Sequence, residues 1–218
     1  MARKHENEPA ERRAVELRAE ETDAGKEVVF TPVVFGQETR IKDWWTGDEY
    51  REMIAPNALD SCDMSDVLFC VNHEYERVPL ARSKNGRGTL RLEVTPAGLN
   101  ARAVLDVEGN PEAATLYSAV KRGDITGCSF MFRVAGDHWQ GLDSDNPLRI
   151  IDAISVIHEV SAVNDPAYPQ TSISARSAEE TGPSPLEEAR ARARAEEETE
   201  AQEALRLEKA RNANKVKK

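Results

Sequence analysis

All twelve aromatic residues of this 218-residue chain, five Phe, three Trp and four Tyr, lie between Phe30 and Tyr168. The segments on either side are instead rich in Glu, Arg and Ala. Because a packed core needs large apolar side chains, this distribution confines the folded domain to the middle of the chain. We therefore divide the chain into a charged, helix-prone extension at 1–26, a folded domain at 27–176, and a flexible linker with a charged helical tail at 177–218.

The overall charge and the cysteines exclude several classes of protein. The formal net charge is -10, whereas binding to a nucleic-acid backbone needs a basic surface. No apolar run has the length of a membrane span, and the N-terminus lacks the apolar core of a signal peptide, so we expect a cytosolic protein without nucleic-acid or membrane partners. The spacing of Cys62, Cys70 and His73 matches no compact zinc knuckle. We expect neither a metal nor a cofactor.

The middle of the chain alternates strand and helix signals, which predicts an α+β domain. Residues 27–35 are rich in β-branched and aromatic side chains, and Pro32 within them indicates an edge strand or a bulge. Residues 90–105 alternate apolar and polar side chains around a Pro-Ala-Gly turn, which predicts a β-hairpin. Asn110 followed by Pro111 is a typical helix start, and Gly123 is a typical helix end.

After Gly123 the chain alternates again, and this stretch contains Ser129. Cys128, Phe130 and Phe132 share one face of the expected strand. Ser129 points to the opposite face, beside Gly127, so its hydroxyl is accessible while the aromatic residues anchor the backbone behind it. From this stretch alone an ordinary solvent-facing serine is favoured over a nucleophile, although the pattern is compatible with both.

Two further segments contain residues suited to catalysis. A short apolar run at 67–71 predicts a buried strand, with His73 at its polar exit. Residues 148–163 predict one long strand or two joined strands. In regular alternation His158 and Glu159 point to opposite faces, so only a bulge would bring both to one site.

Five segments together resemble, in the same order, the sequence blocks of the prohead maturation proteases of tailed bacteriophages. They are Tyr50–Leu59, Asn72–Glu74, Gly88–Leu90, Gly123–Phe132 and Glu159–Pro169. The resemblance covers roughly residues 27–173. It implies a serine endopeptidase with the fold of the herpesvirus assemblins, a small β-barrel of mostly antiparallel strands wrapped by helices.

Block by block, the resemblance assigns the catalytic histidine to His73, the serine to Ser129 and the acidic residue to Glu159. These types suit peptide hydrolysis, which needs a nucleophile, a base that titrates near neutrality and a group that orients the base. His158 and Asp165 are rivals for the third role, and a dyad without a third member is a further alternative. Arg82 or Arg133 would be a charged donor to the oxyanion, in addition to backbone N–H groups.

The resemblance also implies a setting and substrates. The enzyme would act in the cytoplasm of the infected bacterial host, inside the prohead, on segments of the scaffold and the major capsid protein, and on itself. We also expect self-association. One alternative is an inactive scaffolding or assembly protein with the same fold. Another, a peptidase that uses Cys128, is disfavoured because Cys128 shares the apolar face of the phenylalanines.

Overall fold

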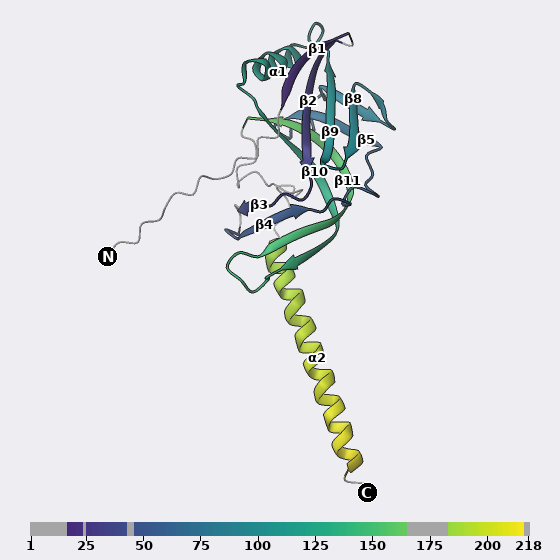
Figure 1. Ribbon diagram of the computed structural model, residues 1–218, viewed down its shortest axis with the longest axis vertical. Coiled ribbons are helices and arrows are strands. Elements are labelled where there is room, and N and C mark those ends of the chain that lie inside the picture. The colour runs from purple at the N-terminus through teal and green to yellow at the C-terminus, as the bar shows by residue number, and fades with distance from the viewer. Residues whose placement is uncertain (1–16, 24, 43–45, 165–182, 216–218) are drawn as a thin grey trace, which may run out of the picture.

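The fold comes from a computed structural model, in which residues 17–23, 25–42, 46–164 and 183–215 are described. Within these ranges the elements in chain order are β1 (Arg18–Thr22), β2 (Gly25–Val34), β3 (Thr39–Lys42), β4 (Glu49–Ile54), β5 (Asp66–Val71), β6 (Ala81–Lys84), β7 (Arg87–Gly88), β8 (Leu90–Thr95), β9 (Gly98–Leu105), α1 (Pro111–Arg122), β10 (Gly127–Gln140), β11 (Leu148–Val163) and α2 (Pro185–Lys215). They form a mixed α+β fold in which strands predominate (Figure 1).

A four-stranded antiparallel sheet has the order β1-β2-β9-β8. The expected hairpin is present as β8 and β9, which pair from Leu90 with Ala103 to Thr95 with Gly98. Gly98 is needed at this turn, since a Cβ there would lie 1.9 Å from the carbonyl oxygen of Val33 on β2. The β2–β9 register shifts between Phe30 and Val33, so Pro32 lies at an irregularity of an inner strand and not on an edge.

The second sheet is organised around β11, a single strand of 16 residues. Along one edge of β11, β4 pairs in parallel with its beginning and β5 pairs in parallel with its end. Along the other edge, β10 runs antiparallel from Gly127 opposite Val163 to Gln140 opposite Leu148. The path order is β3-β4-β11-β5-β6-β7. β11 is therefore held on both sides along most of its length.

The main core lies between the two sheets and contains residues from both. Phe30 of the first sheet and Phe69 of the second have ring centroids 5.0 Å apart. Ile154, Ile157 and Val160 of β11 are at most 1% exposed, and each such side chain stabilises the fold by about 1.5–3 kcal/mol. This burial fixes β11, and with it the side chains on its other face.

Helix α1 forms as its end signals predicted. The Asn110 side chain accepts hydrogen bonds from the backbone N–H groups of Glu112 at 3.0 Å and Ala113 at 3.4 Å. Gly123 ends the helix with a φ of 79°, a conformation that favours glycine. Tyr117 is buried, and its hydroxyl donates to the carbonyl of Glu20 at 3.3 Å, which joins α1 to β1.

Two expectations about the architecture were wrong. Among the described residues the strands form two sheets and no closed barrel, and only α1 and the first turn of α2 pack on the sheets, so the body is not wrapped by helices. Residues 18–22, expected in a helical extension, form β1 and pair with Gly25–Val29 of β2. The local composition favoured a helix, but an available edge of β2 and the burial of Leu17 outweigh that weak preference.

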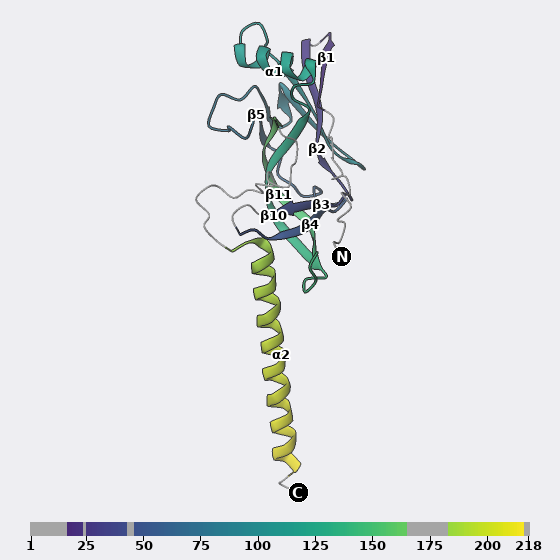
Figure 2. The ribbon, with the colours of Figure 1, turned by 90° about the vertical axis from the view of Figure 1, so that its left-hand side faces the viewer.

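Helix α2 projects away from the body as a long single rod (Figures 1 and 2). Its first turn is docked: Leu186 is 2% exposed and packs with Ile41 and Tyr50. Ser184 and Glu187 form a capping box, in which the Glu187 N–H donates to the Ser184 hydroxyl at 3.1 Å and the Ser184 N–H donates to the Glu187 carboxylate at 2.9 Å. No helix among the described residues is long and apolar enough to cross a membrane.

Candidate active site

Two of the three expected catalytic residues belong to one antiparallel pair of strands. Ser129 on β10 lies opposite Ser161 on β11, and Met131 lies opposite Glu159. Residues that face each other across a sheet, and residues two apart on one strand, share the same face. Ser129, Ser161 and Glu159 therefore lie on one face of the second sheet.

A β-bulge at His158 separates it from Glu159. Met131 pairs with Glu159 while Phe132 pairs with Ile157, so His158 is an extra residue in β11 with no partner in this ladder. The side chain of His158 is exposed, and the Nε of Arg133 donates to its Nε2 at 3.3 Å. Although a bulge is present, it leaves His158 in contact with Arg133 on the outside of the fold.

The position of His73 follows from the parallel pairing of β5 with β11. Both strands end at the same edge, so the residues after Val71 lie beside the end of β11. Asn72 and His73 have φ angles of 50° and 61°, in the left-handed region. The Asn72 N–H continues the ladder to the carbonyl of Ala162 at 2.9 Å, and the His73 N–H donates to the hydroxyl of Ser161 at 3.1 Å.

The side chains of His73 and Glu159 form a hydrogen-bonded pair between Nδ1 and Oε1. The Glu159 side chain is 1% exposed, and its other oxygen, Oε2, accepts from the hydroxyl of Ser161. A carboxylate can only accept, so Nδ1 of the neutral imidazole carries the proton and Nε2 has the lone pair. Nε2 is buried and has no hydrogen-bond partner in the structure. An imidazole in this tautomer can take a proton at Nε2, which is the chemistry of a general base.

Residues 13–183 match the family described as Caudovirus prohead serine protease. The chain belongs to this family. No curated protein and no solved structure matches the chain. Family membership confirms the resemblance seen in the sequence and implies a serine protease of phage capsid maturation.

In this prohead protease the other expected participants are engaged elsewhere or lie outside the described residues. Arg82 makes a two-point ion pair with Asp66, with both N–O distances 2.6 Å. Arg133 bonds His158 as described above. Asp165 is outside the described residues. These bonds leave further N–H donors on both guanidinium groups, so a role of either arginine at the oxyanion stays a prediction.

Cys128, the residue before Ser129, is not poised for nucleophilic attack. It is 4% exposed on the apolar face of β10, and burial raises the pKa of its thiol to about 12. At neutral pH the side chain is therefore a thiol, whereas the reactive form of cysteine is the thiolate. Among the described residues no group of three or more His, Cys, Asp or Glu side chains could hold a metal ion.

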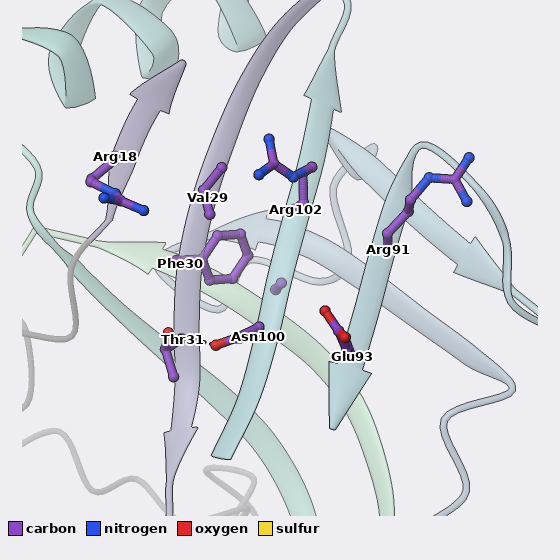
Figure 3. Close-up of a pocket in the computed structure, with 9 residues that line it drawn as sticks. Arg18, Val29, Phe30, Thr31, Arg91, Glu93, Asn100 and Arg102 are labelled. Atoms are coloured by element: carbon purple, nitrogen blue, oxygen red, sulfur yellow. Dashed lines mark hydrogen bonds between the residues drawn. The ribbon is translucent and has the colours of Figure 1, made fainter. Parts of the chain in front are cut away.

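A hollow of about 410 Å³ lies on the outer face of the other, four-stranded sheet (Figure 3). Arg91 and Glu93 of β8 and Asn100 and Arg102 of β9 border it, and Thr31 donates to Asn100 at 3.0 Å. Its lining includes no serine, histidine or cysteine. The hollow therefore offers no nucleophile or base for peptide hydrolysis and is separate from the Ser129 face.

Sequence reasoning did not single out Ser161, which touches both His73 and Glu159. The signal was present, because Ser161 follows Glu159 by two residues on a predicted strand and so shares its face. What the sequence could not show was that β5 lies beside this part of β11. Without that pairing, nothing linked a serine near residue 161 to a histidine near residue 73.

Proposed function

We propose that Ser129, His73 and Glu159 are the catalytic triad of this prohead maturation protease. The observation that carries the proposal is the orientation of His73: Glu159 holds Nδ1, Nε2 is unpaired, and Ser129 lies on the same sheet face. No other histidine among the described residues contacts a buried carboxylate. His138 pairs with the exposed Asp152, and His158 bonds Arg133.

The mechanism follows from these positions. The Oγ of Ser129 attacks the carbonyl carbon of the scissile bond while Nε2 of His73 takes its proton. Glu159 stabilises the imidazolium that forms. The imidazolium then protonates the leaving amine, which departs and leaves an acyl ester on Ser129. Water hydrolyses the ester with His73 acting as base again, and this returns Ser129 to its starting form.

The rigidity of the site supports the same conclusion. Glu159 and Ser161 lie between two neighbouring strands, and the residues around them on β11 are anchored in the core. Ser129 and Glu159 lie on strands, and His73 lies two residues after the end of β5 with its main chain bonded to Ser161. Such anchoring keeps the geometry of a site better than a long loop does, which favours a preorganised base. Substrates would be segments of the scaffold and major capsid protein, cleaved inside the prohead in the host cytoplasm. Crowding there would promote self-association and self-cleavage.

The decisive experiment is co-expression with the neighbouring capsid protein, followed by mass spectrometry of the products. The intact chain should generate defined fragments, Ser129→Ala should generate none, and Cys128→Ala should behave like the intact chain. A fluorophosphonate probe should label the intact chain at Ser129. If the intact chain neither cleaves nor labels while its fold is normal, the inactive assembly protein is the correct reading. If Ser129→Ala still cleaves, the serine mechanism is wrong.

A further inference from the structure

Ser161 connects the two residues on which the proposed base depends. It is 0% exposed, and its hydroxyl accepts from the backbone N–H of His73 at 3.1 Å while donating to Oε2 of Glu159. A serine hydroxyl has one proton to donate, and here that proton goes to the carboxylate. Ser161 thus contacts the main chain of the base and the side chain of its orienting group at once.

The backbone at His73 needs such support. Asn72 and His73 are consecutive non-glycine residues with positive φ, a conformation that persists only where surrounding structure enforces it. The bonds that enforce it come from one strand end: Ala162 accepts from the Asn72 N–H, and the Asn164 N–H donates to the Asn72 side chain at 3.2 Å. Ser161 supplies the bond at His73 itself. The position of the imidazole is therefore set from β11.

The carboxylate of Glu159 also needs hydrogen bonds to hold it in one orientation. Its side chain is almost fully buried, and a buried carboxylate must have its oxygens bonded to stay in one orientation. Oε1 contacts His73 and Oε2 contacts Ser161. Without the Ser161 hydroxyl, Oε2 would have no donor in this arrangement and the carboxylate would be free to turn away from Nδ1.

We propose that Ser161 is a positioning residue for catalysis, which locks Glu159 and the main chain of His73 into the geometry in which Nδ1 bonds Glu159 and Nε2 is left unpaired. The proposal rests on the proposed function of the Ser129 face. Ser161 is not itself the nucleophile, since it is fully buried and its proton is committed to Glu159. It acts on the rate through His73 and leaves the substrate-contacting surface unchanged.

The test compares the rate at which a fluorophosphonate probe labels Ser129 in purified full-length variants. Ser161→Ala should slow labelling by roughly 10- to 100-fold, the size of effect expected when a reacting group is misplaced by about 1 Å. Ser83→Ala is the matched control, because Ser83 is 3% exposed on β6 of the same sheet and bonds neither His73 nor Glu159 in the structure. It should label at the wild-type rate.

A double-mutant cycle separates positioning from a general loss of stability. If Ser161 acts through Glu159, Ser161→Ala should slow labelling much less in a Glu159→Gln background than alone. The proton resonance of the His73 Nδ1–H, shifted downfield by Glu159, should weaken or move in Ser161→Ala and stay in Ser83→Ala. Labelling of Ser161→Ala at the wild-type rate, or effects of the two changes that simply multiply, would overturn the proposal.

The same experiment shows which inference has failed. If Ser129→Ala is still labelled, or if Glu159→Gln labels like the wild type, the proposed triad is wrong and the role of Ser161 falls with it. If both variants behave as the triad requires and only Ser161→Ala is normal, the triad stands and the positioning role of Ser161 is refuted. Thermal unfolding of each variant identifies any whose loss of labelling reflects a loss of fold.

Discussion

Ser129 and Ser161 are direct cross-strand partners in the β10–β11 ladder, yet their hydroxyls have different environments. Ser161 is fully buried and bonds both His73 and Glu159, whereas Ser129 is half-buried and bonds neither. One face of two paired strands thus holds one serine bonded to both His73 and Glu159 and one serine bonded to neither. We therefore expect single substitutions to separate the roles proposed for the two serines.

The first prediction concerns His73 as the proposed base, Glu159 as the residue proposed to orient it, and His158 as the rival for that second role. His73→Ala should reduce the peptide cleavage rate most severely, because it removes the group that takes the proton. Glu159→Gln should reduce the cleavage rate less than His73→Ala, since it weakens only the orientation and charge stabilisation of the imidazole. His158→Ala should cleave at close to the wild-type rate, because His158 bonds Arg133 on the outside. Initial rates on one unfolded substrate check all three.

Two results would contradict this prediction. Activity that survives in His73→Ala would mean that another group is the base. A His158→Ala variant slower than Glu159→Gln would mean that His158, and not Glu159, is the third member of the triad.

The second prediction concerns the pH dependence of stability. Burial raises the pKa of Cys128 to about 12, above the value near 9 of an exposed thiol. The folded state therefore holds the Cys128 proton more tightly than the unfolded state, so the stability this provides is full below about pH 9 and is lost as the pH rises toward 12. Between pH 8 and 10.5 the ionisation of Cys128 alone should lower the free energy of unfolding by about 2 kcal/mol.

The measurement is the free energy of unfolding in urea at the two pH values, for the wild type and for Cys128→Ala. The variant should lose about 2 kcal/mol less over the interval, since lysines, tyrosines and the other two cysteines titrate in both proteins. Equal losses would show that Cys128 is not protected from ionisation in the folded state. Iodoacetamide at pH 8 should likewise leave Cys128 of the folded protein unmodified.

The third prediction separates the two contributions of Asn72. Asn72→Gly removes the side-chain acceptor for the Asn164 N–H but tolerates a φ of 50°, whereas Asn72→Ala loses the acceptor and also strains the backbone. We expect Asn72→Ala to be less stable than Asn72→Gly by about 1 kcal/mol. Urea unfolding of both variants checks this difference. A variant with alanine as stable as the one with glycine would show that the loop relaxes to another conformation.

Local signals in the sequence were sufficient for the parts of the fold that depend on neighbouring residues. The ends of α1 at Asn110 and Gly123 and the hairpin of β8 and β9 are of this kind, since caps and tight turns need only a few adjacent residues. The placement of Ser129 on the face opposite Phe130 and Phe132 was likewise readable from alternation.

The remainder depended on pairing between distant segments. The bulge at His158 exists because β10 has one residue fewer than β11 at that point, and no pattern within β11 alone reveals it. The strand β1 exists because it pairs with an edge of β2, and the two open sheets result from pairing between strands that are distant in the sequence. Local sequence patterns do not show which strands pair. The same holds for Ser161, whose role requires β5 and β11 to be neighbours.

The fourth prediction concerns the foot of α2. Because Leu186 packs with Ile41 and Tyr50, deletion of residues 178–218 should expose this small cluster and lower the melting temperature. Deletion of residues 191–218 keeps Leu186 and the bond from Arg190 to the carbonyl of Leu142, and should melt like the full chain. Both truncated proteins should still cleave an unfolded substrate. If the two deletions melt alike, the docked turn contributes nothing to the stability of the body.

The last prediction concerns self-cleavage in the tail, which we place between about Arg176 and Ala189. Residues 176–182 of this window lie outside the described residues, but its later part is docked: Ser184 caps α2 and bonds Asp48, and Leu186 and Ala189 are buried. A protease cleft takes an extended chain, so peptide bonds within 185–189 are protected unless the first turn of α2 unfolds. We therefore expect cleavage before Pro185 in the concentrated wild-type enzyme.

Leu186→Ala supplies the control for this argument. Loss of its packing should let the first turn open and add cleavage sites between residues 185 and 189, which intact-mass measurement resolves from the wild-type products. Ser129→Ala should remain full length, and so should a Leu186→Ala variant that also carries Ser129→Ala. Wild-type products ending within 185–189 would show that docking does not protect this turn. A purified enzyme that stays full length at high concentration while cleaving capsid protein would show that the tail is not a substrate.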